Sequence, residues 1–296
     1  MVPTQSPSSR LTPSSLRSLA ARHGIRPRKS LGQHFLIEPA LARRIVGLAE
    51  VGPDTRVLEI GAGLGSLTIA LAEAGAEVVA VELDRALVPP LTEVVGGFEK
   101  VRVTVQDAMT ADWGTSLGGD GPPWIVVANL PYNVAVPVIL RLLETEPRVE
   151  RMLVMVQREV GERLAAGPGH GAYGAVSLRV AYRATARVVR RVSPTVFWPK
   201  PAVESVLVSI VRRPPPVEVE EAALWKVVRR SFEQRRKTMR AALMRLGLDR
   251  GEAEKVLGSC GVEARARPEE LGLAEFACLA ERWMATRARG PDDFGP

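Results

Sequence analysis

A polar amide and an aromatic ring follow the apolar run 124–128, in the tetrapeptide Asn129-Leu130-Pro131-Tyr132. The run has the length and composition of a buried parallel strand, which places the tetrapeptide at the carboxyl end of that strand. Open α/β sheets bind their ligands in the crevice outside those ends. Because an amide beside an aromatic ring suits a flat, hydrogen-bonding ligand such as a nucleobase, the tetrapeptide points to chemistry on the amino group of an adenine.

Methyl transfer to that amino group needs hydrogen-bond acceptors, because the nitrogen lone pair is delocalised into the ring. The Asn129 side-chain oxygen and the Leu130 carbonyl can accept the two amino protons, and Pro131 fixes the turn that aims the carbonyl. Tyr132 can stack on the base, a contribution of about 1–3 kcal/mol. No strong general base is needed, since the proton leaves after the nitrogen has become cationic. The alternative for the tetrapeptide alone is a capping Asn and a buried Tyr in an ordinary strand-to-helix turn.

A glycine-rich turn, Gly61-Ala62-Gly63-Leu64-Gly65, separates a predicted strand at 57–60 from a predicted helix at 66–73. Glycine permits the tight turn and lets a ligand approach the backbone closely. A dinucleotide-binding fingerprint would have glycine at the sixth position, where this chain has Ser66, so a pyrophosphate site is disfavoured. Glu82, 21 positions after Gly61, can accept hydrogen bonds from ribose hydroxyls, which both NAD and S-adenosylmethionine carry.

Three further polar residues distinguish between these two cofactors: Glu59 precedes the turn, Asp107 closes the third predicted strand and Asn129 closes the fourth. S-adenosylmethionine has no phosphate, and it needs acceptors for its ribose, its adenine amino group and its ammonium group. Carboxylates and carbonyls supply them. Any one of these acids could instead be a helix cap or a solvated loop residue. Together with the tetrapeptide, they predict S-adenosylmethionine as the cofactor.

Alternating strand and helix patterns predict the α/β class, as a Rossmann-like methyltransferase sheet that is mostly parallel and doubly wound. The predicted strands lie at 57–60, 78–81, 101–105, 124–128 and 152–156, with a helix at 137–143 among the segments between them. A less regular apolar run at 203–211 follows.

A triproline, Pro214-Pro215-Pro216, then marks a linker, since it can neither continue a strand nor begin a helix interior. Helical patterns beyond it, at 220–246, 250–257 and 273–287, predict a small helical domain. The predicted organisation is a disordered leader over 1–25, a methyltransferase domain over 26–213, a helical RNA-binding domain over 214–290 and a tail over 291–296.

The charge balance favours an anionic partner, nucleic acid above all. The chain has 296 residues, with 40 Lys and Arg against 33 Asp and Glu, a net charge of +7 and a pI near 9.9. No apolar stretch approaches the roughly 18 residues of a membrane span. Cys260 and Cys278 lie far apart and outside metal-ligand spacing, so we expect reduced thiols and no metal site.

The start of the chain is basic, and its first acidic residue is Glu38. An acid-poor segment with many Arg and Ser residues resembles an organelle transit peptide. Its prolines, Pro3, Pro7 and Pro13, argue against an amphipathic helix there. We therefore expect a disordered leader that runs into an RNA-facing segment of a cytoplasmic protein, with mitochondrial import as the alternative.

Taken together, the motifs resemble those of the ribosomal RNA adenine dimethyltransferases. The similarity spans about residues 20 to 285 and includes 30–36 (SLGQHFL), 59–65 (EIGAGLG), Glu82, Asp107, 129–133 (NLPYN), 157–160 (QREV), 197–205 (FWPKPAVES) and 235–238 (RRKT). The resemblance is greatest to the bacterial small-subunit type of the family. It implies dimethylation of two adjacent adenosines near the 3′ end of 16S ribosomal RNA, a role in ribosome biogenesis, and a target base held between Tyr132 and Phe197.

The same resemblance implies three groups of site residues. The catalytic group comprises Asn129, Leu130, Pro131, Tyr132 and Phe197. Cofactor contacts fall on His34, Leu36, Gly61, Gly63, Glu82, Asp107 and Asn129. RNA contacts fall on Arg229, Arg230, Arg235, Arg236, Lys237 and Arg240. The chain departs from the usual family pattern in having His34 where many members have Asn, and in the position of Lys200 between two prolines.

Three other functions share part of this pattern. Large-subunit rRNA adenine methyltransferases that confer macrolide resistance have the same glycine turn and a similar tetrapeptide, but the basic stretch 235–238 and the segment 172–174 favour the small-subunit enzyme. DNA adenine methyltransferases more typically have proline in place of Leu130. A non-catalytic ribosome-assembly or transcription factor could retain the fold, although the set of Glu82, Asp107 and Asn129 favours an enzyme. Nothing in the sequence specifies a self-complementary surface, so we expect a monomer.

Overall fold

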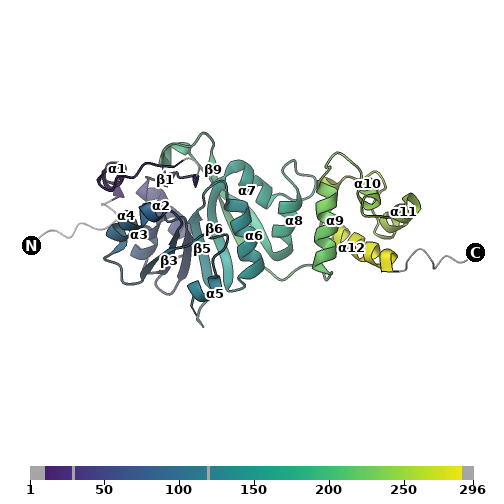
Figure 1. Ribbon diagram of the computed structural model, residues 1–296, viewed down its shortest axis with the longest axis horizontal. Coiled ribbons are helices and arrows are strands. Elements are labelled where there is room, and N and C mark those ends of the chain that lie inside the picture. Colours follow the sequence, from purple (N-terminus) through teal and green to yellow (C-terminus); the bar gives the residue numbers. More distant parts are fainter. Residues whose placement is uncertain (1–10, 29–30, 119–120, 289–296) are drawn as a thin grey trace, which may run out of the picture. The chain divides into compact units, whose positions relative to one another are not determined.

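The computed structural model describes residues 11–28, 31–118 and 121–288. The chain forms two compact units (Figure 1). The first comprises Met1–Gly161 and Ala186–Arg212, and the second comprises Glu162–Thr185 and Arg213–Pro296. The predicted boundary, after residue 213, lies one residue beyond the last of these divisions, at 212/213. The segment 162–185 differs from the prediction, because its apolar side chains, Tyr173, Leu178 and Tyr182 among them, belong to the core of the second unit.

A seven-stranded sheet forms the centre of the first unit, in the order β4-β3-β2-β5-β6-β9-β7. Five parallel strands correspond to the five predicted runs: β2 (Arg56–Ile60), β3 (Glu77–Glu82), β4 (Val101–Val105), β5 (Trp124–Asn129) and β6 (Val149–Gln157). β9 (Ser205–Arg212) runs antiparallel to β6, and β7 (Ala184–Val192) closes that edge. The Rossmann-like methyltransferase class is confirmed, with an added antiparallel end that the sequence patterns did not predict.

The helices of the first unit lie beside the sheet (Figure 1). They are α2 (Pro39–Leu48), α3 (Ser66–Glu73), α4 (Val88–Val95), α5 (Trp113–Ser116), α6 (Ala135–Thr145) and α7 (Arg158–Ala165), the last of which extends into the second unit. β5 is buried from Trp124 to Ala128 because it lies between β2 and β6. This central position fixes the tetrapeptide that follows the strand.

A short helix, α1 (Pro13–Arg22), occupies part of the predicted disordered leader. The prediction was wrong for these residues because Pro13 lies at the first turn of the helix, where a missing amide hydrogen costs nothing, and Thr12 caps the amide of Ser15. Leu16 and Leu19 are buried against the core of the first unit. Residues 1–10 of the predicted leader lie outside the described part of the chain.

Helices make up the second unit: α8 (Ala175–Arg183), α9 (Glu221–Phe232), α10 (Met239–Met244), α11 (Arg250–Ser259) and α12 (Leu273–Ala288). The single helix predicted at 220–246 is in fact two helices, because α9 ends at Phe232 and Thr238 caps the start of α10. The intervening turn contains most of the basic stretch 235–238. Leu224, Val227 and Phe276 are among the fully buried side chains of this core.

Cys260 and Cys278 form a disulfide in the second unit. The prediction of reduced thiols was wrong because Cys260 ends α11 and Cys278 lies within α12, and folding of the two helices brings their Cα atoms to 5.8 Å. The sequence separation of 18 residues carried no sign of this proximity. No helix among the described residues is long and apolar enough to span a membrane.

Candidate active site

The glycine turn between β2 and α3 has a backbone that only glycine adopts easily. Gly61, Gly63 and Gly65 have φ angles of +77°, +60° and +87°. A Cβ atom on Gly61 would lie 3.2 Å from Cδ of Pro131, and one on Gly63 would lie 3.1 Å from the ring of Phe35. The turn therefore packs directly against the tetrapeptide, and its residues Gly61 to Gly63 line the cavity described below.

Glu82, at the end of β3, is held by backbone amides. Its two carboxylate oxygens accept hydrogen bonds from the amides of Gly63, at 2.8 Å, and Asp84, at 2.9 Å. The residue is only 7% exposed, and burial raises the pKa of its carboxyl group although these amides lower it. The predicted ribose acceptor is thus fixed in position beside the glycine turn.

Glu59, two residues before Gly61, is the most deeply buried carboxyl group near the turn. It is 1% exposed, and burial raises its pKa to about 8; the Thr68 side chain lowers this pKa and the negative charge of Glu82 raises it, both to a smaller extent. Its Oε2 atom has no hydrogen-bond partner among the described residues. A buried oxygen without a partner beside a cleft is available to a ligand that can donate a proton or carries positive charge.

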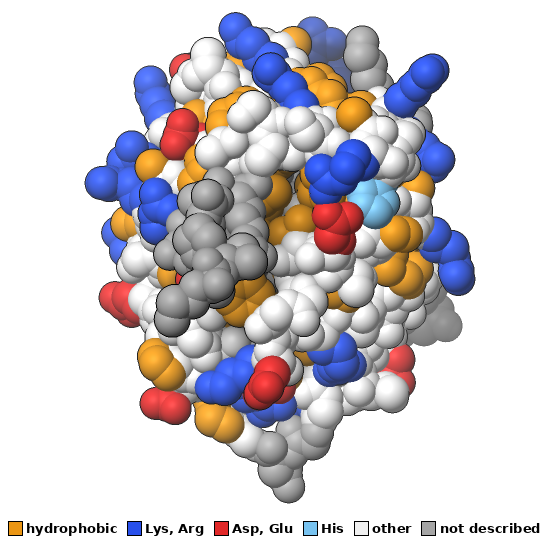
Figure 2. Space-filling model, turned by 90° about the vertical axis from the view of Figure 1, so that its left-hand side faces the viewer, with side chains coloured by type: hydrophobic (Ala, Val, Ile, Leu, Met, Phe, Trp, Pro, Cys, Tyr) orange, Lys and Arg blue, Asp and Glu red, His pale blue; other side chains and the backbone are white. Residues whose placement is uncertain are grey.

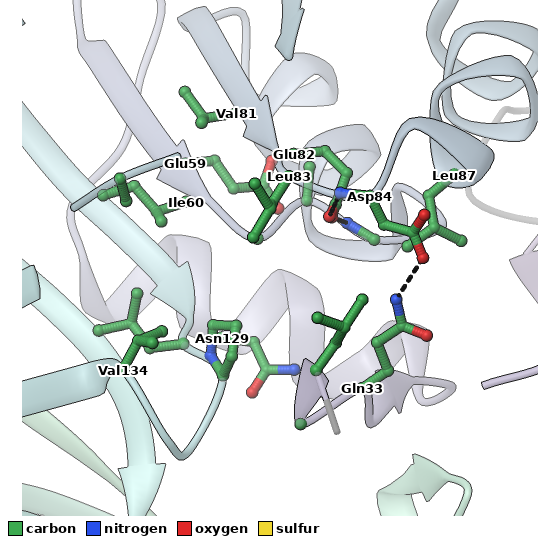
Figure 3. A pocket seen from close by; sticks show the side chains of 18 of the residues that line it. Gln33, Glu59, Ile60, Val81, Glu82, Leu83, Asp84, Leu87, Asn129 and Val134 are labelled. Atoms are coloured by element: carbon green, nitrogen blue, oxygen red, sulfur yellow. Dashed lines mark hydrogen bonds between the residues drawn. The ribbon is translucent and has the colours of Figure 1, made fainter. Parts of the chain in front are cut away.

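The carboxyl ends of β2, β3 and β5 converge on one cavity (Figure 3), and Asp107, after the end of β4, also lines it. It has a volume of about 1090 Å³ including its part open to solvent. The structure brings ten predicted site residues to its lining: His34, Leu36, Gly61, Gly63, Glu82, Asp107, Asn129, Leu130, Pro131 and Tyr132. Its described charged lining residues are all acidic, namely Glu59, Glu82, Asp84 and Asp107.

Asn129 is oriented by a backbone group from a distant segment. Its Nδ2 atom donates to the carbonyl of His34 at 3.0 Å. Using the donor side of the amide in this way leaves the side-chain oxygen available as an acceptor. The Leu130 amide donates to the carbonyl of Met155 at 3.1 Å, which holds the start of the tetrapeptide against β6.

Tyr132 is fixed at both ends of its side chain. Its hydroxyl is hydrogen-bonded to Oγ of Ser205 at 2.7 Å, and its ring stacks on the imidazole of His34 at a centroid separation of 5.3 Å. Burial raises the pKa of the phenol. Nδ1 of His34 is in turn 2.7 Å from the carbonyl of Pro199, so the imidazole is held on the tyrosine ring.

Phe197 does not line this cavity. It lies in β8 (Phe197–Trp198), which pairs antiparallel with β1 (Phe35–Leu36), and it is 3% exposed. The ring beside Tyr132 in this structure is that of His34. The placement of a target base between Tyr132 and Phe197 remains a prediction.

A hydrogen-bonded link across the cavity, absent from the sequence analysis, joins Gln33 to Asp84 in the segment after β3. Nε2 of Gln33 donates to Oδ2 of Asp84 at 2.9 Å, drawn as a dashed line in Figure 3, and Oε1 of Gln33 accepts from the amide of Arg28. Gln33 lies within the motif 30–36, but nothing in that motif identifies its partner. Ser30 of the motif lies outside the described residues.

The predicted RNA-binding residues of the second unit fall into two groups. Arg235 donates to the carbonyl of Tyr173 at 2.8 Å, and Arg230 and Arg240 form ion pairs with Glu233 and Glu254. The other three, Arg229, Arg236 and Lys237, are exposed and have no ion pair within the described part of the chain. The second group has neither a hydrogen bond nor an ion pair to hold it within the described part of the chain, so its charges are available to a phosphate backbone. The charge of Arg235 is not neutralised by its carbonyl partner, but its side chain is held in place.

Comparison with known proteins gives a family match over nearly the whole chain. The model of the family described as ribosomal RNA adenine dimethylase matches residues 24–283. The chain belongs to this family. The ribosomal RNA small subunit methyltransferase A of Thermobifida fusca is 49% identical over 277 residues, which cover 92% of this chain and 95% of the relative. The protein with the same name from Streptomyces coelicolor is 46% identical over 278 residues, covering 93% and 97%.

Solved structures agree with this fold. A dimethyladenosine transferase from Plasmodium falciparum has a TM-score of 0.72 at 22% identity and covers 86% of this chain and 98% of its own. The 23S rRNA methyltransferase ErmE has a TM-score of 0.63 at 28% identity, over 84% of this chain and 99% of its own. The family predicted from the motifs is confirmed, and so is the methyltransferase fold, that of enzymes dependent on S-adenosylmethionine.

Proposed function

We propose that this rRNA adenine dimethylase uses S-adenosylmethionine to dimethylate the exocyclic amino groups of two adjacent adenosines near the 3′ end of 16S ribosomal RNA, as a step in ribosome biogenesis. The observation that carries the proposal is the position of Asn129. Its donor side is bonded to the carbonyl of His34, and its acceptor side is available in the cavity at the end of the central strand.

The charge of the cavity lining fits the proposed cofactor. The absence of Lys and Arg among the described lining residues disfavours a pyrophosphate, whereas four acidic side chains suit a ligand with a sulfonium and an ammonium group. Glu82 would accept from the ribose hydroxyls and Asp107 from the adenine amino group, while Glu59 and the glycine turn would lie along the rest of the ligand. S-adenosylmethionine supplies an electrophilic methyl group.

The remaining chemistry belongs to the tetrapeptide. The Asn129 side-chain oxygen and the Leu130 carbonyl accept the protons of the target amino group, which localises the nitrogen lone pair for attack. Tyr132, anchored by Ser205, presents its ring for stacking on the base. The proton departs from a cationic nitrogen, so a nearby strong base is not required.

Small-subunit rRNA is the favoured substrate over large-subunit rRNA. The curated relatives at 44–49% identity are named small subunit methyltransferase A, whereas the large-subunit enzyme ErmE is a more distant match at 28% identity. The exposed Arg236 and Lys237 of the helical unit are consistent with an extended RNA contact. We infer a cytoplasmic monomer that acts on the small subunit or its precursor; sedimentation of the free protein would test its monomeric state.

The decisive experiment is methyl transfer from labelled S-adenosylmethionine to small ribosomal subunits that lack this modification. We expect two adjacent dimethyladenosines, located by mass spectrometry of the RNA. Asn129→Ala should reduce single-turnover transfer at saturating cofactor by at least about 100-fold, as for loss of a donor or acceptor used in the transition state. Labelling of large subunits instead would refute the substrate assignment. Undiminished transfer by Asn129→Ala would refute the mechanism.

A further inference from the structure

The edge strand β7 carries an unusual concentration of unpaired positive charge. Residues 163–203 contain seven Arg and Lys but no Asp or Glu, although the whole chain has 33 acidic residues. Within this segment, Arg187, Arg190 and Arg191 lie on β7 and are exposed. None of these three arginines has an ion pair or a side-chain hydrogen bond within the described part of the chain. Because no described residue pairs with these guanidinium groups, they are available to a partner.

The opposite edge of the same sheet provides a comparison. Its edge strand β4 has a single arginine, Arg102, which donates to the carbonyl of Ser116 at 2.6 Å. The basic character is therefore specific to the β7 edge. The neighbouring strand β9 adds no carboxylate, since its sequence is SVLVSIVR.

The geometry of a strand spaces these charges along an extended line. Arg187 and Arg191 point to one face of the strand and Arg190 to the other, because successive side chains alternate. Val189, between Arg187 and Arg191 on their face, packs on the core of the first unit, which fixes the strand and so positions both arginines. The distance from residue 187 to residue 191 along the strand is about 13 Å, at roughly 3.3 Å per residue, enough to contact more than one phosphate.

We propose that the β7 edge, defined by Arg187, Arg190 and Arg191, binds the phosphodiester backbone of the substrate RNA. This inference rests on the proposed function and assigns the catalytic unit its own RNA-binding surface, separate from the basic residues of the helical unit. Arginine forms bidentate contacts with phosphate. β7 has no aromatic side chain to stack on a base, so the contact positions RNA without reading its sequence.

Figure 2 shows Lys and Arg side chains spread over one face of the protein, with Asp and Glu between them. The test must therefore distinguish RNA binding by the β7 edge from attraction by the general positive charge of the protein. The chain offers a matched control in Arg43 and Arg44 of α2, an adjacent pair in the same unit, exposed and without an ion pair in the described part of the chain. The two double variants, Arg190→Gln with Arg191→Gln and Arg43→Gln with Arg44→Gln, remove the same charge.

Binding of unmodified small-subunit RNA would be measured by filter retention between about 50 and 200 mM salt, without S-adenosylmethionine. We expect the β7 double variant to reduce the magnitude of the slope of log affinity against log salt by about 1 to 2. The α2 double variant should change it by less than about 0.5. Adding Arg187→Gln should reduce the slope further.

An equal loss of slope in both pairs would overturn the proposal, because long-range charge would then explain it. An unchanged slope in the β7 pair would also overturn it. Unaltered thermal unfolding and cofactor affinity are the controls for folding. Since binding is measured without methyl transfer, failure of the methylation assay would count against the proposed function and leave this readout intact.

Discussion

At the scale of single residues, the cofactor cleft combines negative charge with burial. Burial raises the pKa of Glu59 to about 8 and also raises that of Glu82, a residue that is 7% exposed. A neutral Glu59 at pH 7 leaves one buried oxygen without a partner in the described part of the chain. A bound cationic ligand would favour the ionised forms of both groups, since an opposite charge nearby lowers the pKa of a carboxyl.

Stability should therefore decrease as the pH rises. The Glu59 pKa is about 8 in the folded protein against 4.5 as its ordinary value, so between these values the folded state keeps a proton that the unfolded chain releases. Its contribution is complete below about pH 4.5 and is lost as the pH rises through about 8. The free energy of unfolding in urea should be higher at pH 5 than at pH 8 by on the order of a few kcal/mol. Glu59→Gln should lose much of this difference. The full wild-type pH dependence in the variant would assign the effect to other groups.

Tyr132 should contribute through its ring more than through its hydroxyl. Tyr132→Ala removes the stacking surface and should lower kcat/KM for small subunits by roughly 10- to 100-fold, in line with about 1–3 kcal/mol per stacked base. Tyr132→Phe keeps the ring and loses only the bond to Ser205, so we expect less than about a fivefold loss. Equal losses in the two variants would show that the hydroxyl, and not stacking, carries the effect.

At the scale of elements, the turn between α9 and α10 separates structural from available arginines. Arg235 was predicted to bind RNA, but its guanidinium donates to the carbonyl of Tyr173 and thereby ties the turn to the segment before α8. Arg236 and Lys237, next along the chain, are exposed. Adjacent residues of one basic motif thus have different surroundings, which the sequence alone does not distinguish.

Arg235→Ala should destabilise the helical unit by about 1 kcal/mol, because the partly buried carbonyl of Tyr173 loses this hydrogen-bond donor. The matched double variant Arg236→Ala with Lys237→Ala should leave thermal unfolding unchanged and weaken binding of small subunits, most strongly at low salt. Calorimetry and binding at two salt concentrations would separate the two effects. If Arg235→Ala lowered RNA affinity with no change in unfolding, Arg235 would be an RNA contact after all.

Elements whose boundaries follow from burial patterns were predicted well. The strands of the parallel sheet are continuous apolar runs, and the polar residues that end them, such as Glu82 and Asn129, converge because parallel strands end on the same side. Elements defined by tertiary contacts were not predicted. β7 is a half-exposed, arginine-rich strand, and the disulfide partners and the Gln33–Asp84 bond meet only after folding.

At the scale of the whole molecule, the sequence predicted two domains in series, whereas the chain divides in a less simple way. The triproline lies next to one division, but it gives no sign of the other two, at 161/162 and 185/186. The periodicity of α8 shows that it is amphipathic without showing which core its apolar face joins. That choice depends on partners such as Leu224 and Phe276, which lie far along the chain.

The excursion of residues 162–185 into the second unit makes the two units topologically interdependent. The chain crosses between them three times, so no single cut separates a complete catalytic unit from a complete helical one. A fragment ending at residue 213 would keep Tyr173, Leu178 and Tyr182 while losing the helices that cover them. Exchange of helical units between relatives would therefore require transplanting two segments together, and the linker at the triproline is not by itself a site for modular recombination.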